Sequence, residues 1–237
     1  MKILLRSFAM FIRQITEDYM LVGVFAAPIL MGTAFRFGVP FAEELLTGQF
    51  SLPQILPPYY LLFDLFMCIA TPYFFCFVSA LVMLTEYDEN MVNYLAVTPL
   101  GRRGYIVSRL VLPAILSFAA SLLILRFFAL TRWDGLLLIV ACALSCLMSV
   151  AVALMLFSLS SNRVEGMALG KMANIYTLGL LVPFFIESAA QYLFAPLPSF
   201  WLAKMCVEGD YFLLLPAVLT SIAWIWILYR KFERKLV

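Results

Sequence analysis

The side chains that most often carry out catalysis are scarce in this sequence of 237 residues. It contains no histidine, which excludes Ser-His-Asp and Cys-His catalysis, zinc sites that need histidine and a histidine ligand for haem. The five cysteines form no Cys-x-x-Cys pair and are expected to be small buried side chains: Cys68, Cys76, Cys142, Cys146 and Cys206. We therefore expect no metal site, and the chain is predicted not to be an enzyme.

Charged residues at membrane depth are the remaining candidates for chemistry. Asp64, Glu187, Arg36 and Arg126 all lie near the ends of apolar segments. A pair of Asp64 with Arg126 could form an outer gate or line a substrate path. The alternative is that each side chain only reaches the outer headgroups. An intramembrane enzyme would require Asp64 and Glu187 to face each other in a wet cavity.

The composition indicates that these residues sit in a membrane protein. The sequence is 65% hydrophobic and 13% charged, with a mean hydropathy of +1.00, whereas soluble domains are roughly 45–50% apolar and about 25% charged. A net charge of +2 gives no reason to expect a nucleic-acid partner. Six apolar stretches free of charged residues are predicted to cross the bilayer as helices: 19–35, 65–85, 110–125, 135–162, 172–186 and 211–229. The predicted fold class is an all-α membrane protein, with one domain over residues 1–237.

The distribution of lysine and arginine predicts that both termini lie in the cytoplasm, because cytoplasmic segments carry an excess of these residues. The inner segments then hold Lys2, Arg6, Arg13, Arg102, Arg103, Arg109, Arg163, Lys171, Arg230, Lys231, Arg234 and Lys235. The outer segments hold Arg36, Arg126, Arg132 and Lys204. Residues 1–16 are expected to form an interfacial helix, since their basic and apolar side chains separate onto two faces at helical spacing.

Two further patterns concern the later spans. Small residues repeat every four positions in the fourth span, at Ala141, Ser145, Ser149 and Ala153, which suits close packing within the chain or a dimer contact. Residues 188–210 are too apolar for a free loop and too broken by proline for a span. We expect them to form short helices that dip back into the membrane on the outer side.

The segment between the second and third spans carries the strongest internal pattern. Apolar side chains recur there at helical spacing and predict a short amphipathic helix: Tyr87, Met91, Tyr94 and Leu95. Thr98-Pro99 favours the start of a new helix that runs through Arg102 and Arg103 into the third span. Residues 86–104 are therefore predicted to form a helix-break-helix elbow with an acidic start and a basic end, which a soluble partner could recognise. The alternative is a solvated turn.

This elbow resembles the cytoplasmic loop after the second span in the permease subunits of type-2 ATP-binding-cassette exporters. That loop runs as an acidic cluster, Gly-Thr, a few residues, a Leu and then Thr-Pro-Leu. The residues that match it are Glu86, Asp88, Glu89, Leu95 and Thr98-Pro99-Leu100. The residues that depart from it are Asn90 and Met91, where Gly-Thr is usual, and Asn93, where an acidic residue is common. The interfacial helix, the six spans and the outer stretch also agree, so the resemblance covers essentially the whole chain.

The resemblance implies that the elbow is a coupling helix that sits in a groove of a cytoplasmic ATPase. The residues it assigns to this coupling are Glu86, Asp88, Glu89, Asn90, Tyr94, Thr98, Pro99, Leu100, Arg102 and Arg103. The sequence contains no G-x-x-x-x-G-K-[ST] phosphate loop. No cofactor is therefore expected on this chain, and ATP and Mg²⁺ belong to the separate ATPase subunit.

The resemblance also implies a multi-pass permease of the bacterial inner membrane. Two such subunits, identical or homologous, would work with two ATPase subunits in the lipid bilayer. They would export a drug, lipid or antimicrobial peptide by alternating access. The alternative function is a non-transporting membrane anchor or sensor that recruits an ATPase for signalling or toxin immunity.

Overall fold

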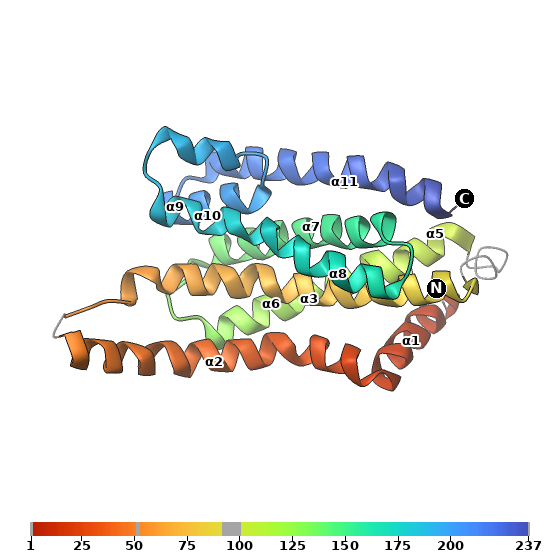
Figure 1. Ribbon diagram of the computed structural model, residues 1–237, viewed down its shortest axis with the longest axis horizontal. Coiled ribbons are helices and arrows are strands. Elements are labelled where there is room, and N and C mark those ends of the chain that lie inside the picture. The colour runs from red at the N-terminus through yellow and green to blue at the C-terminus, as the bar shows by residue number, and fades with distance from the viewer. Residues whose placement is uncertain (1, 51–52, 92–100, 237) are drawn as a thin grey trace.

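The computed structural model describes residues 2–50, 53–91 and 101–236, and these residues form helices and no strands. The long helices lie along the longest axis of the molecule, and the two ends of the chain lie at the same end of the bundle (Figure 1). We call that end the terminal end and the other the opposite end. The predicted all-α class is confirmed.

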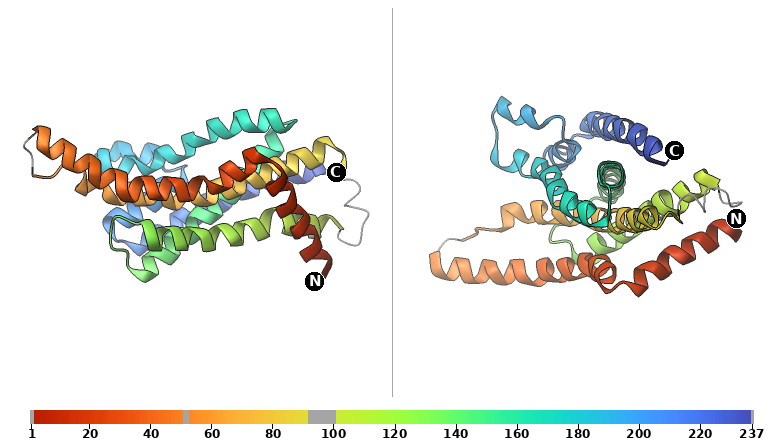
Figure 2. Two further views of the ribbon diagram at one scale, coloured as in Figure 1. Left: turned by 90° about the horizontal axis from the view of Figure 1, so that it is seen from below. Right: turned by 45° about the vertical axis from the view of Figure 1, so that its right-hand side comes forward.

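Helix α1 (Lys2–Glu17) meets α2 (Tyr19–Phe50) at a bend at Asp18. The carboxylate of Asp18 accepts the backbone N–H of Met20 at 2.9 Å, which caps the start of α2. Figure 2 shows α1 turned away from the axis of α2. In α1, Phe11 and Ile15 are buried while Arg13 is exposed. The predicted helix is found, with part of its apolar face buried, and its place at the membrane interface stays a prediction.

Helix α2 is longer than the predicted span 19–35. Its 32 residues measure about 48 Å at 1.5 Å per residue, against about 30 Å of hydrocarbon. Arg36 does not end the helix, because helical backbone is satisfied internally and a long charged side chain can extend to water. Near the end of α2, the Glu43 carboxylate accepts the backbone N–H groups of Ile55 (2.9 Å) and Leu56 (2.7 Å).

Helix α3 (Tyr60–Asp88), which follows the 3₁₀ turn η1 (Pro57–Tyr59), lies at the centre of the fold. In its most apolar stretch 78% of the residues are buried, compared with 17% in α2. Helices α6 (Leu112–Phe128) and α7 (Gly135–Leu159) pack on it. Cys68 Sγ of α3 lies 3.2 Å from Ser145 Oγ of α7. The small residues of α7 are buried, so the predicted close packing within the chain is confirmed.

The described residues on the two sides of the predicted elbow agree with expectation on one side only. α3 continues through Asp88, so no separate amphipathic helix begins at Glu86. The chain then turns at Asn90, whose φ of 57° is a left-handed conformation that asparagine tolerates. From Gly101 onwards, α5 (Gly101–Ile106), a π-helical turn η2 (Val107–Val111) and α6 follow one another directly, as predicted for a helix that runs into the third span.

The predicted fifth span 172–186 is not one helix. α8 (Arg163–Ala173) is followed by a 3₁₀ helix, η3 (Asn174–Leu180), and by the short α9 (Val182–Phe185) with Pro183 in its first turn. Among the described residues, five helices are long and apolar enough to cross a membrane, and this segment is not one of them. Figure 1 shows the segment running back along the bundle from the terminal end towards the opposite end.

The rest of the chain consists of η4 (Ala189–Phe194), α10 (Pro198–Glu208), η5 (Tyr211–Leu213) and α11 (Leu214–Leu236). The expectation of short helices in 188–210 is confirmed. η3 approaches α10 very closely at Gly179, where a Cβ atom would lie 2.7 Å from the backbone nitrogen of Phe200. Ser199 also donates to the carbonyl of Tyr176 at 2.5 Å. Only glycine allows this contact between the two elements.

Candidate functional site

Glu86 and Arg109 form an enclosed ion pair at the terminal end. Arg109 Nη2 lies 2.6 Å from Glu86 Oε1, and its Nε lies 3.0 Å from both carboxylate oxygens. Each side chain exposes only 1% of its surface. The expectation that Glu86 belongs to an acidic patch open to a soluble partner is therefore wrong. The Glu86 side chain faces Arg109, and a buried carboxylate is stable only when it is paired with an opposite charge.

Helix α1 covers this pair. Arg109 Nη1 donates to the carbonyl of Ser7 at 2.7 Å, and the Ser7 hydroxyl donates to Ser108 Oγ at 3.1 Å. The guanidinium also lies 5.4 Å from the centre of the Phe11 ring. The buried charge of Arg109, on the π-helical turn η2, thus contacts both α1 and α3, which are distant from it in the sequence.

The other residues of the predicted coupling elbow divide into two groups. Asp88, Glu89, Asn90 and Arg103 are exposed at the terminal end. Outside the described residues lie Tyr94, Thr98, Pro99 and Leu100, and the side chain of Arg102 is not described either. The coupling role of all these residues stays a prediction.

A second group of contacts at the terminal end centres on Arg163, in the first turn of α8. Its guanidinium forms an ion pair with Asp18, and its backbone N–H donates to Asp88 Oδ2 at 3.2 Å. The Arg163 guanidinium, by its hydrogen bond, holds the pKa of the Asp18 carboxyl below its usual range. Lys235 of α11 donates from Nζ to the carbonyl of Phe157 at 2.7 Å, at the end of α7. These contacts join the starts of α2 and α8 to the end of α3, and the end of α11 to that of α7.

The sequence interpretation missed the roles of Arg109, Ser7, Arg163 and Lys235 and counted the three basic residues only as inner charges. A signal for Arg109 is present, because it is a charged residue at the edge of an apolar run and its partner must come from another helix. The sequence carries no indication that the partner is Glu86.

At the opposite end, Asp64 is buried and holds the connection between α6 and α7. Its carboxylate accepts the backbone N–H groups of Leu130 (2.8 Å) and Thr131 (2.9 Å) and the indole N–H of Trp133 (3.1 Å). The Thr131 hydroxyl donates to it as well. The suggested pair of Asp64 with Arg126 does not form, because these local donors already surround the carboxylate and Arg126 is exposed.

The remaining charged candidates at the opposite end lie apart from Asp64. Arg36 is exposed and donates from Nη1 to the carbonyl of Ala129 at 2.8 Å, next to the end of α6. Glu187 is exposed and follows α9. The Asp64 carboxylate faces the donors of the connection between α6 and α7, and neither Asp64 nor Glu187 lines either of the two grooves described below. The described residues also contain no group of His, Cys, Asp or Glu arranged to hold a metal ion.

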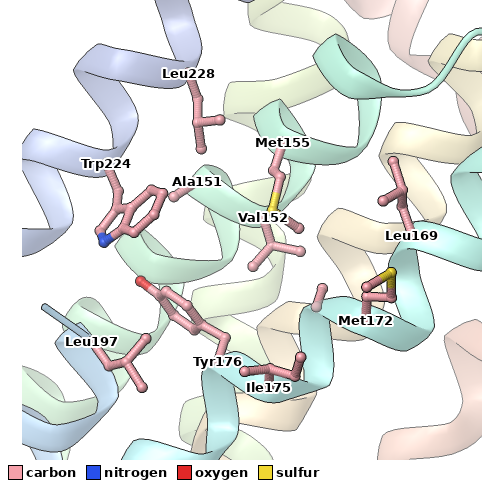
Figure 3. A pocket seen from close by; sticks show the side chains of 11 residues that line it. Ala151, Val152, Met155, Leu169, Met172, Ile175, Tyr176, Leu197, Trp224 and Leu228 are labelled. Carbon is pink, nitrogen blue, oxygen red and sulfur yellow. The ribbon is translucent and has the colours of Figure 1, made fainter. Parts of the chain in front are cut away.

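Two apolar grooves open on the sides of the bundle. The first has a volume of about 300 Å³ and lies between α7, α8, η3 and α11. Figure 3 shows Tyr176 and Trp224 pointing toward one another within it, beside Met155 and Val152. The Tyr176 hydroxyl is buried without a hydrogen-bond partner among the described residues. The second groove, of about 570 Å³, lies between α1, α2, α3 and α6 and is lined mainly by aliphatic and phenylalanine side chains.

Comparison with known proteins gives a match over nearly the whole chain. Residues 11–229 match the family described as "Fluoroquinolones export permease protein Rv2686c-like". Two relatives from Mycobacterium tuberculosis are the fluoroquinolones export permease proteins MT2760 (strain CDC 1551 / Oshkosh) and Rv2686c (strain ATCC 25618 / H37Rv). Each is 23% identical to this chain over 240 residues, which covers 94% of the chain and 91% of the relative. No solved structure matches the chain.

Proposed function

Because this chain belongs to the Rv2686c-like family of fluoroquinolones export permeases, we propose that it exports an aromatic, drug-like substrate by alternating access, driven by a separate ATPase. The family and the two relatives fit a permease subunit of a type-2 ATP-binding-cassette exporter. The chain is thus a transport subunit in a membrane, with several helices apolar enough to cross it. The substrate, the partner and the mechanism are the proposed part.

The observation that carries the coupling mechanism is the placement of charges around the elbow. Glu89 and Arg103 are exposed on the two sides of residues 92–100. Three residues before Glu89 and six residues after Arg103, the buried pair of Glu86 and Arg109 connects α3 to the continuous helical stretch that leads into α6. A protein that binds the exposed charges would therefore act on two central helices at once. We propose that this protein is a cytoplasmic ATP-binding-cassette ATPase.

The proposed assembly contains two permease subunits, identical or homologous, and two ATPase subunits in the bacterial inner membrane. The terminal end is cytoplasmic in this proposal, because the larger share of Lys and Arg belongs to segments at that end. The broken segment from α8 to α9 provides the sixth crossing. Its elements, Arg163–Ala173, Asn174–Leu180 and Val182–Phe185, add up to about 36 Å at the usual helical rises.

The proposed substrate class follows from the relatives and from the first groove. The relatives are named for export of fluoroquinolones, which have an aromatic core. The groove offers the rings of Tyr176 and Trp224 and the thioether of Met155, and such walls bind flat aromatic molecules well. We propose that the substrate contacts this groove on its way through the protein.

The test of the proposed function is purification of the protein from native membranes in mild detergent. A nucleotide-binding ATPase should copurify with the unmodified chain and be lost from the charge-reversal variants Glu89→Arg and Arg103→Glu, because binding between charged surfaces needs complementary signs. Arg126→Glu and Glu187→Arg, which reverse exposed charges at the opposite end, are the matched controls and should retain it. If no ATPase is recovered with the unmodified chain, the proposal is wrong. Recovery of an ATPase without drug export would favour the anchor or sensor instead.

Replacing Trp224 with alanine should lower fluoroquinolone export by about tenfold, because losing a stacking partner and its apolar area costs about 1.4 kcal/mol of binding. The measurement is drug accumulation in cells that express the permease with its ATPase. The matched control is Trp226→Ala, because Trp226 is 56% exposed on the same helix and does not line the groove. The centre of its ring lies 3.8 Å from the guanidinium carbon of Arg230. An equal loss of export in both variants would argue against the groove.

A further inference from the structure

Residue 109 is bound to α3 through its backbone as well as its side chain. In an α-helix, the carbonyl of Arg109 would accept the N–H of residue 113, but Pro113 has none. The π-helical turn η2 lies at this position, and such turns often mark functional sites. The hydroxyl of Ser79 donates to the Arg109 carbonyl. Ser79 therefore binds the carbonyl that the proline leaves without its helical donor.

The side chain of Arg109 binds the same face of α3 about two turns away. Glu86 lies seven residues after Ser79, so both residues project from α3 on one side. Both are buried, with exposed fractions of 1% or less. The guanidinium reaches beyond Glu86 to the carbonyl of Ser7 on α1. Arg109 thus holds α1, α3 and the start of α6 together by hydrogen bonds that water cannot replace.

This arrangement determines how a movement of the elbow would spread. Within the elbow, residues 89–100 connect the end of α3 to α5. Both ends of the elbow therefore belong to helical segments that Arg109 joins. A displacement of the elbow cannot simply bend α3 away from α6 while these contacts persist. It must move both helices, and α1 with them.

We propose that Arg109 is the positioning residue of the transport step. It keeps α1, α3 and α6 as one unit, so that force on the elbow reaches the transmembrane helices and the amphipathic helix α1 together. This proposal rests on the proposed function for the source of that force. α1 then has a mechanical role in transport beyond that of a membrane anchor.

The test uses variants that weaken the contacts without leaving a buried charge unpaired. Arg109→Lys keeps the charge but loses the fork that reaches both partners. The double variant Glu86→Gln/Arg109→Gln removes both charges, and Ser79→Ala removes the backbone contact. Ser121→Ala is the matched control, because Ser121 is buried on α6 and its hydroxyl has no partner among the described residues.

The first readout is hydrogen exchange of the permease alone in lipid nanodiscs. The variants should speed exchange in α1 and α5 and leave that of α7 unchanged, whereas Ser121→Ala should resemble the unmodified protein. Unchanged exchange in α1 and α5 of the double variant would overturn the proposal. This readout needs no ATPase, so it decides whether Arg109 holds the elements together even if the proposed function fails.

The second readout is the number of substrate molecules transported per ATP hydrolysed by the permease reconstituted with its ATPase. We expect this ratio to fall by about fivefold or more in the variants. A factor of about five is the lower end of the range by which one site of a protein usually affects another. A residue that only stabilises the fold would reduce transport and ATP hydrolysis in proportion, because fewer molecules would be active. An unchanged ratio in folded variants would therefore overturn the proposal, and a failure of the unmodified permease to bind ATPase would count against the proposed function instead.

Discussion

Arg109→Ala should destabilise the protein by about 3–5 kcal/mol, because it leaves the Glu86 carboxylate buried without its partner. The side chains of Glu86 and Arg109 are each 1% exposed, so neither has access to compensating water. For a chain of this size, the loss corresponds to a fall of about 6–20 °C in the unfolding midpoint. The measurement is thermal unfolding of the purified protein in detergent, followed by intrinsic fluorescence.

Two companion variants separate the charge effect from other causes. Arg103→Ala removes an arginine that is exposed on the same helical stretch, and it should change the stability by no more than about 0.5 kcal/mol. The double variant Glu86→Gln/Arg109→Gln should be more stable than Arg109→Ala, because it buries no unpaired charge. An unfolding midpoint for Arg109→Ala equal to that of the unmodified protein would contradict the buried pair.

Asp64→Ala should have the second large effect, with a loss of about 2–5 kcal/mol. The substitution leaves the backbone N–H groups of Leu130 and Thr131 and the indole of Trp133 without their acceptor. A fully buried donor left unsatisfied costs about 1–3 kcal/mol, and each of these donors should cost less because Leu130, Thr131 and Trp133 are only half-buried. We also expect limited proteolysis to cut residues 129–134 faster, because the carboxylate is what fixes this connection. Thermal unfolding and the rate of cleavage provide the measurements.

The control for Asp64 is Glu187→Ala, which removes an exposed carboxylate at the same end and should leave both measurements nearly unchanged. The outcome also tests the gate that the sequence suggested. A gating carboxylate would make Asp64→Ala abolish export while leaving stability and proteolysis as they were. That result would contradict the structural role assigned to Asp64.

The spans show how far charge-free runs can predict helices in a membrane protein. The central helices were predicted well, because apolar residues in lipid must form helices that satisfy their own backbone. The end of α2 was missed, since Arg36 interrupts an apolar run without interrupting the helix. The fifth span was predicted as one helix, whereas Pro183 and close contact with α10 at Gly179 accompany its division into three elements.

The candidate site was predictable in position but not in contacts. The acidic residues at the end of the second span and Arg103 do lie at the terminal end. Glu86, however, faces Arg109 and not solvent, and Asp64 binds the loop 130–133 and not Arg126. Helical spacing tells which residues share a face of one helix, but it does not tell which face meets which neighbour.

The sequence by itself determined that this is an all-helical membrane protein with an amphipathic first helix and with charged residues on both sides of residues 92–100, because hydropathy, charge and helical period are local properties. Its resemblance to exporter permeases was also readable there. Only the tertiary structure decided that Arg109 joins α1, α3 and α6 through Glu86, Ser7 and Ser79. These partners lie 23, 102 and 30 residues from Arg109 in the chain, and a buried charge is stable only where the fold brings its partners together.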